Sequence, residues 1–147
     1  RSSATLAGFL NHGFQISFDT VRLVQTTSGS EVFEQLLYME EGDVFFAISF
    51  PRYSKRTINA VAYAKEKGAD VIALTDSPVS PSADCADHLL LAQSDMASFA
   101  DSLVAPMSVI NALIVAVTKE RSAEFSARLL RLEEAWDEYQ VYNKNNG

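Results

Sequence analysis

The sequence predicts a three-layer α/β domain, in which helices cover both faces of a parallel β-sheet. Short apolar runs alternate with segments of helical periodicity along most of the 147 residues. These runs are apolar throughout, which indicates strands that are covered on both faces. Two of them flank a helix of about a dozen residues, the pattern of a right-handed βαβ unit.

The first part of the chain predicts a helix, a strand and a short second helix. Leu6 and Leu10 lie on one face of an N-terminal helical pattern. The run 20–24 has the composition of a strand of modest strength. Ser30 is expected to cap a short helix that continues through Leu37.

The middle of the chain contains the strongest strand signals. Three strands rich in β-branched, aromatic and other apolar residues are predicted at 43–49, 70–75 and 88–91. Between the first two, Ile58, Val61 and Ala62 have the spacing of a one-faced helix. Gly68 is expected to end that helix.

Two helices are predicted in the C-terminal part. The uncharged stretch 102–118 is shorter than a membrane span and contains Pro106, so we expect a buried helix and no membrane contact. A second helix carries an apolar stripe at steps of four and three, Phe125, Leu129, Leu132, Trp136 and Tyr139. We expect this stripe to pack on its own domain, with a second subunit as the alternative.

Composition restricts the classes of function. A hydrophobic content of 48% with 21% charged residues fits one domain with a substantial core. The net charge of −7 argues against direct contact with nucleic acid, because phosphate binding depends on clustered Lys and Arg. The single cysteine, Cys85, cannot form an internal disulfide, which suits a cytoplasmic protein.

The candidate binding residues follow the strands, because ligands of open parallel sheets bind at the carboxyl ends of the strands. They are Ser49, Arg52, Ser54 and Thr57 after the run 43–49, Thr75, Asp76, Ser77, Ser80 and Ser82 after the run 70–75, and Ser2 and Ser3 at the first helix start. Hydroxyls and backbone N–H groups at a helix start suit a phosphate. Arg52, Lys55 and Arg56 also favour a small acidic ligand, although Ser54 as a simple helix cap is the alternative.

Catalytic and metal-binding residues are not expected. His12 and His88 are far apart in sequence, and no Cys or carboxylate stands at metal-ligand spacing from either. Glu31 and Glu34 offer carboxylates that can act as a base, but an exposed glutamate at a helix start is the default explanation for them. We therefore predict no cofactor, no metal and no enzyme activity.

Three segments, 49–57, 71–78 and 101–107, resemble the sugar isomerase (SIS) domain in the form found in RpiR-type bacterial transcriptional regulators. The resemblance covers nearly the whole chain. It implies a flavodoxin-like sheet of five parallel strands, a homodimer or higher oligomer, and a pocket for a phosphorylated sugar. It also implies that serine and threonine loops hold the phosphate.

The resemblance assigns roles to individual residues. Ser2 and Ser3 match the first phosphate loop of the family, and Ser49, Ser54 and Thr57 match the second. This second loop departs from the enzymes of the family. It is longer, Lys55 stands in place of a glycine, and Arg52 is expected to replace backbone donors.

The resemblance also predicts the organisation and function of the longer protein. Residues 1–142 would be an N-terminally truncated SIS domain that lacks the family's first strand and its helix-turn-helix domain, and 143–147 would be a polar tail. The predicted function is sensing of a phosphosugar or related acid, with DNA bound only by a domain outside this chain. The alternatives are an aldose–ketose isomerase that uses Glu31 or a histidine as base, and a pure dimerisation scaffold.

Overall fold

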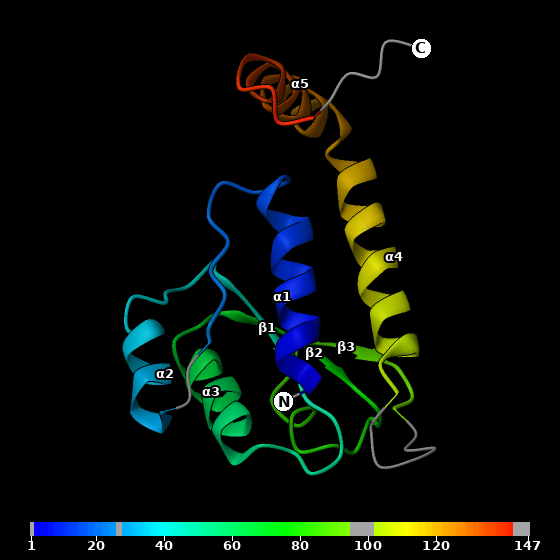
Figure 1. Cartoon of the computed structure of the whole chain (residues 1–147). Helices are drawn as coiled ribbons and strands as arrows, with labels where there is room; N and C mark the ends of the chain where they lie inside the picture. Colours follow the sequence, from blue (N-terminus) through cyan, green and yellow to red (C-terminus); the bar gives the residue numbers. More distant parts are fainter. Residues whose placement is uncertain (1, 26–27, 95–101, 143–147) are drawn as a thin grey trace.

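The computed structural model describes residues 2–25, 28–94 and 102–142, and it confirms the predicted three-layer α/β architecture (Figure 1). Its elements are α1 (Ser2–Gln15), α2 (Gly29–Gln35), β1 (Val44–Ile48), α3 (Lys55–Glu66), β2 (Asp70–Thr75), β3 (His88–Leu91), α4 (Val104–Glu120) and α5 (Ser122–Glu138). The strands pair in parallel in the order β1-β2-β3. The three strands predicted in the middle of the chain are therefore confirmed.

The two faces of the sheet are buried against different helices. On one face, α1 and α4 pack on the sheet through a cluster that consists of Leu6, Leu10, Ile48, Phe50, Leu74, Ala92 and Ile110. On the other face, α3 packs through Val61 and Ala64 against Ala47 and Val71, and α2 packs beside α3. Ala47 and Ile48 thus point to opposite faces, as successive residues of a strand do.

The predicted strand at 20–24 is wrong, because this segment is irregular. A strand needs a neighbour that accepts and donates its backbone hydrogen bonds, and β1 pairs only with β2 in the described part of the chain. Val24 instead packs against the cluster that Val32 and Leu36 form beneath α2. The sheet of the described residues accordingly has three strands and not the five that the resemblance implied.

The structure shows which residues stand at the start of α2 and at the end of α3, where caps were predicted. Ser28, and not Ser30, is the N-cap of α2, and the Oγ atoms of the two serines lie 2.9 Å apart. Gly68 follows α3 with φ of +83°, a backbone conformation that residues with a Cβ rarely adopt. The predicted stop at Gly68 is therefore confirmed.

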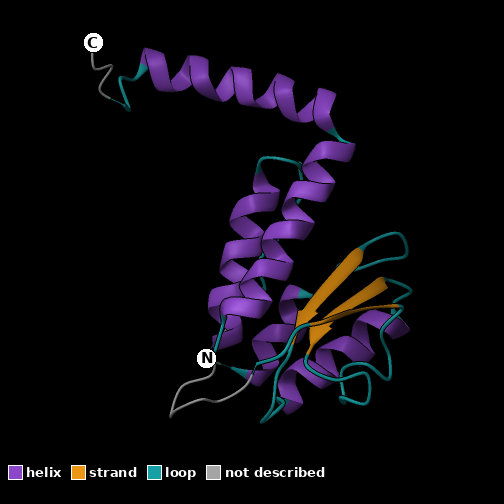
Figure 2. Cartoon of the chain, turned by 90° about the vertical axis from the view of Figure 1, so that its right-hand side faces the viewer, coloured by secondary structure: helices purple, strands orange, loops and turns teal. Residues whose placement is uncertain are grey.

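The C-terminal helices are covered less than predicted. In α4, Pro106 and Ile110 are buried, whereas Val104 and Val115 are exposed. No residue of α5 is buried, and Figure 2 shows this helix projecting away from the sheet. The expectation that α4 is buried holds only for the side that faces α1 and the sheet.

Two contacts join α5 to the loop after α1. Arg128 forms an ion pair with Asp19 at 2.7 Å, and the Arg121 guanidinium lies 4.7 Å from the centre of the Phe18 ring. The stripe residues Phe125, Leu129, Leu132 and Trp136 are half-buried, and Tyr139 is exposed. The apolar stripe is therefore only partly covered by its own domain.

Asp87, directly before β3, forms contacts with both β2 and α3. Its Oδ2 atom accepts the backbone N–H of Val71 at 2.8 Å, and its Oδ1 atom pairs with Lys65 of α3. The hydrogen bond from Lys65, followed by that from Val71, lowers the pKa of Asp87. Because its pKa is lower in the folded than in the unfolded chain, Asp87 stabilises the fold at neutral pH and loses this effect as it is protonated.

We expect Asp87→Asn to lower the free energy of unfolding at neutral pH, and we expect the difference from the wild type to shrink below about pH 4. Urea unfolding at pH 7 and pH 3 measures both values. Asp84→Asn, an exposed change in the preceding loop, is the control and should have little effect at either pH. An equal loss at both pH values would contradict the role of the Asp87 charge.

Candidate functional site

Buried hydroxyls gather at the carboxyl edge of the sheet. The Ser49 N–H donates to the Leu74 carbonyl at 3.0 Å, which extends the β1–β2 ladder and sets Ser49 beside Thr75. Ser49 is 3% exposed and Thr75 is fully buried. In the loop after β2, Ser80 and Ser82 are also buried, and their Oγ atoms lie 3.3 Å apart. The edge predicted to bind a ligand is therefore lined with polar groups.

The loop between β1 and α3 is held at two points. Phe50 is buried in the core beneath α1 and α4. Tyr53 donates a hydrogen bond from its Oη atom to Asp76 Oδ1 at 2.8 Å. Between them, Arg52 has a φ of +67°, in the left-handed region that a residue with a Cβ seldom occupies. A strained residue held between two fixed points is common at binding sites.

Ser54 begins α3 but does not cap it with its side chain. It occupies the N-cap position with φ of −74° and ψ of 120°, its carbonyl accepts the Ile58 N–H at 3.1 Å, and its hydroxyl makes no capping hydrogen bond. Ser54 is thus the N-cap residue of α3, as the alternative explanation expected, but its hydroxyl takes no part in the cap. Thr57, in the first turn of α3, is half-buried. The first-turn N–H groups and these hydroxyls form an arrangement that suits an anion.

The N-terminal end of α1 lies at the same edge. Leu6 packs with Ile48 and Phe50 at the end of β1, and Figures 1 and 2 show the start of α1 near the carboxyl ends of the strands. Ser3 is half-buried there. The side chain of Ser2 lies outside the described part of the chain. The structure thus brings Ser3 to the same edge as Ser49, Ser54 and Thr57.

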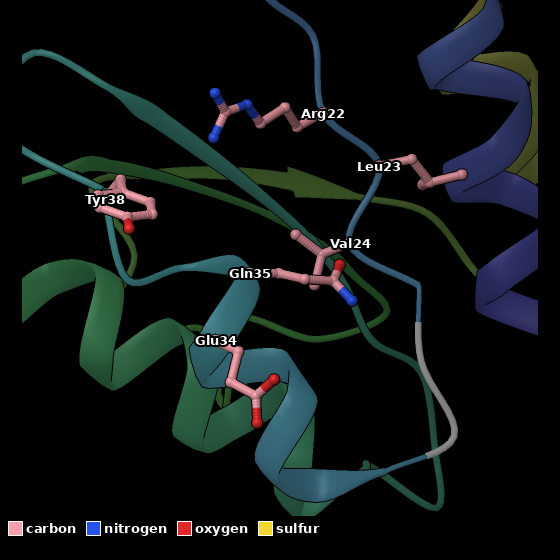
Figure 3. Close-up of a pocket in the computed structure, with 6 residues that line it drawn as sticks. All are labelled: Arg22, Leu23, Val24, Glu34, Gln35 and Tyr38. Carbon is pink, nitrogen blue, oxygen red and sulfur yellow. The ribbon is translucent and has the colours of Figure 1, made fainter.

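The other candidate groups lie elsewhere. Glu34 lines a shallow depression of about 490 Å³ together with Arg22, Leu23, Val24, Gln35 and Tyr38 (Figure 3). None of the predicted binding residues lines this depression. His12 is exposed on α1 and His88 is exposed at the start of β3, the opposite end of that strand from the carboxyl edge.

The described part of the chain has neither a metal-binding cluster nor a membrane-spanning helix. Within the ranges that the structure describes, no group of three or more His, Cys, Asp or Glu side chains is placed to hold a metal ion. None of the described helices combines the length and the apolar character that crossing a membrane requires.

The contact between Tyr53 and Asp76 was not predicted from the sequence. Both residues follow predicted strands, and parallel strands end at a common edge, so their proximity was within reach of sequence reasoning. The specific pairing was not, since it depends on the path of the loop through Arg52. The contact joins the loop after β1 to the loop after β2.

Comparisons with known proteins agree on one family. Residues 18–116 match the SIS domain. An HTH-type transcriptional regulator of Caldanaerobacter subterraneus is 36% identical over 87 residues, which cover 56% of this chain and 31% of the regulator. The chain matches about a third of the length of its curated relatives.

Two solved structures share this fold. The sugar isomerase domain of an RpiR transcription factor from Sphaerobacter thermophilus is 32% identical, with a TM-score of 0.82 over 89% of this chain and 73% of that one. The NanR protein of Vibrio vulnificus, solved in complex with ManNAc-6P, is 16% identical, with a TM-score of 0.76 over 95% of this chain and 53% of that one.

Proposed function

This chain belongs to the SIS domain family, and we propose that it is the phosphosugar-sensing domain of a cytoplasmic transcriptional regulator. The ligand is a sugar phosphate or a related small acid, bound at the carboxyl edge of the sheet. A DNA-binding domain outside residues 1–147 responds to it. The regulator from Caldanaerobacter subterraneus and the RpiR domain support this class of function, since both are named as regulators.

The single observation that carries the proposal is the set of hydroxyls at this edge. Ser49, Ser54 and Thr57 lie at the end of β1 and the start of α3, and the Ser54 hydroxyl is not used to cap the helix. The positive end of the helix dipole and the first-turn N–H groups favour a phosphate beside these hydroxyls. Arg52 and Ser3 complete the proposed site. The ManNAc-6P complex of NanR supports a phosphosugar as the ligand.

We expect the ligand to act by changing the balance between two arrangements of a larger protein. The net charge of −7 makes these residues unsuited to DNA contact, and the curated relatives that match this chain are about twice as long. Residues 1–142 form the sensing domain in this proposal, and 143–147 a polar tail. A strand that precedes α1 in the longer protein would pair with the outer edge of β1 and complete the sheet.

A homodimer is part of the proposal, with α5 as a main contact. The helix has an apolar stripe and no buried residue. Its two halves differ in charge. Residues 121–131 contain three Arg and one Glu, and residues 132–139 contain three Glu and one Asp. Two copies of α5 in antiparallel arrangement would join their stripes and place each positive half opposite a negative half, as a two-fold interface requires.

A thermal-shift screen tests the proposed function directly. The chain is heated with pentose and hexose phosphates, including ManNAc-6P, and with phosphorylated sugar acids. A ligand that binds only the folded state at a hundred times its dissociation constant stabilises it by about 2.7 kcal/mol, a shift of several degrees. No shift with any of these compounds would contradict the proposal. For any ligand found, exchange of solvent deuterium into its carbon-bound hydrogens would favour an isomerase instead.

The double variant Ser54→Ala, Thr57→Ala tests the position of the phosphate. Each lost hydrogen bond to a charged group costs about 1.5–3 kcal/mol, so we expect the affinity for a sugar phosphate to fall by at least about a hundredfold. The thermal midpoint of the free protein should change little. Isothermal titration calorimetry measures the affinity, with Ser122→Ala at the exposed start of α5 as control. An unchanged affinity in the double variant would exclude this position for the phosphate.

A further inference from the structure

Asp76 lies at the end of β2 and accepts two hydrogen bonds on one oxygen. Tyr53 Oη donates to Asp76 Oδ1 at 2.8 Å, and Thr75 Oγ1 donates to the same atom at 3.2 Å. Asp76 and Tyr53 are both half-buried. The carboxylate is thus positioned by two neutral hydroxyl groups and not by a cation in the described part of the chain.

The second oxygen of Asp76 is available to a ligand. Among the described residues, no side chain or backbone group donates a hydrogen bond to Oδ2, and none forms an ion pair with Asp76. A half-buried carboxylate gains from a further donor, because hydrogen bonds to a charged acceptor are stronger than those between neutral groups. The structure therefore leaves a strong acceptor at the edge where Ser49 and Thr75 lie.

Tyr53 keeps this acceptor oriented. Burial, and then its hydrogen bond to Asp76 and the charge of that carboxylate, raise the pKa of Tyr53 above its ordinary value. The phenol accordingly remains protonated at neutral pH and continues to donate its proton to Asp76. The tyrosine follows Arg52 in the loop that leads to Ser54, so one contact positions both the carboxylate and the phosphate-binding loop.

The chemistry of Asp76 excludes a phosphate as its partner. Two anions close together repel each other, whereas the hydroxyls of a sugar are donors that a carboxylate accepts. We propose that Asp76, oriented by Tyr53, binds a hydroxyl of the sugar ring or chain while the serine and threonine hydroxyls at the start of α3 bind its phosphate. This inference rests on the proposed function. It assigns the discrimination between a neutral sugar and a sugar acid to one carboxylate.

Two ligands distinguish the contribution of Asp76 to binding from that of the hydroxyls that bind the phosphate. One is the hexose phosphate that gives the largest thermal shift in the screen, and the other is glycerol 3-phosphate, which keeps the phosphate but has no sugar ring and fewer hydroxyls. We expect Asp76→Asn and Tyr53→Phe to weaken hexose phosphate binding by about tenfold and about threefold, respectively. Binding of glycerol 3-phosphate should change less than twofold. Calorimetry measures the affinities.

For a phosphorylated sugar acid, we expect Asp76→Asn to strengthen binding, in contrast to its effect on the hexose phosphate. Asp76→Asn removes a negative charge from the site, so 6-phosphogluconate should bind more tightly to this variant than to the wild-type protein. A variant that is merely misfolded would bind every ligand more weakly. Tyr63→Phe is the matched control, because Tyr63 lies on α3 and contacts Phe33 and Lys67 instead of the site.

The outcomes distinguish this inference from the proposed function. If the wild-type chain binds no phosphate ester, the proposed function fails and the inference fails with it. If the hexose phosphate binds but both variants retain its full affinity, only the inference is overturned. An equal loss of hexose phosphate and glycerol 3-phosphate would also overturn it, since Asp76 would then act on the phosphate end or on the fold.

Discussion

Replacing Leu132 and Trp136 of α5 by glutamate is expected to convert a dimer into a folded monomer. Both side chains lie in the apolar stripe of a helix that has no buried residue, so their loss should scarcely affect the domain itself. In a dimer, each would lose about 1.5–3 kcal/mol of burial and add an unpaired carboxylate. We expect the dissociation constant of the dimer to rise by at least about a hundredfold. Analytical ultracentrifugation measures it.

Leu130 offers a matched control on the same helix. Leu130 is 60% exposed, and since successive residues of a helix are about 100° apart, it lies about 140° around the helix from the middle of the stripe. Leu130→Glu should leave the dimer intact. If the double variant stays dimeric while its helix content is retained, the proposed interface is wrong and another surface joins the two copies. The apolar depression at Phe9, Val104 and Met107 is then the next surface to test.

Replacement by alanine is expected to have opposite effects on the free energy of unfolding at Gly8 and at Gly13, two glycines of α1. A Cβ atom added at Gly13 would lie 2.4 Å from Cδ1 and 2.9 Å from Cγ1 of Ile114 on α4. Such overpacking costs about 1–3 kcal/mol. At Gly8, nothing lies within 4 Å of the added atom, and alanine favours the helix by about 1 kcal/mol over glycine.

We therefore expect Gly8→Ala to raise the free energy of unfolding and Gly13→Ala to be about 2 kcal/mol less stable than the Gly8 variant. Both variants gain the same helix propensity, so the difference between them isolates the contact with Ile114. Urea unfolding at neutral pH measures both. Equal stabilisation at the two positions would mean that Ile114 moves aside without cost.

The central strands could be predicted because their signal is local. The run 43–49 combines β-branched and aromatic residues between turn signals, and the structure has a strand at Val44–Ile48. The run 20–24 has a similar but weaker pattern, and it failed because a strand also depends on a partner. Composition reports whether a segment fits a sheet, not whether a neighbouring strand lies beside it.

The candidate site could be predicted as a region but not as a set of contacts. The rule that ligands bind at the carboxyl ends of parallel strands placed Ser49, Ser54 and Thr57 at one edge, and the structure has them there. The positive φ of Arg52 and the hydrogen bond between Tyr53 and Asp76 depend on the path of a loop. Such a path follows from tertiary packing, which in this case is the burial of Phe50.

The length of α4 converts small rotations into displacements. This helix of 17 residues is about 25 Å long and runs from near the end of β3 to α5 (Figure 1). A tilt of about 5° at its start would move its far end by about 2 Å, a shift of the size that rearranges subunit interfaces. A small change of tilt where α4 begins beside the sheet is thus enough to shift the position of α5.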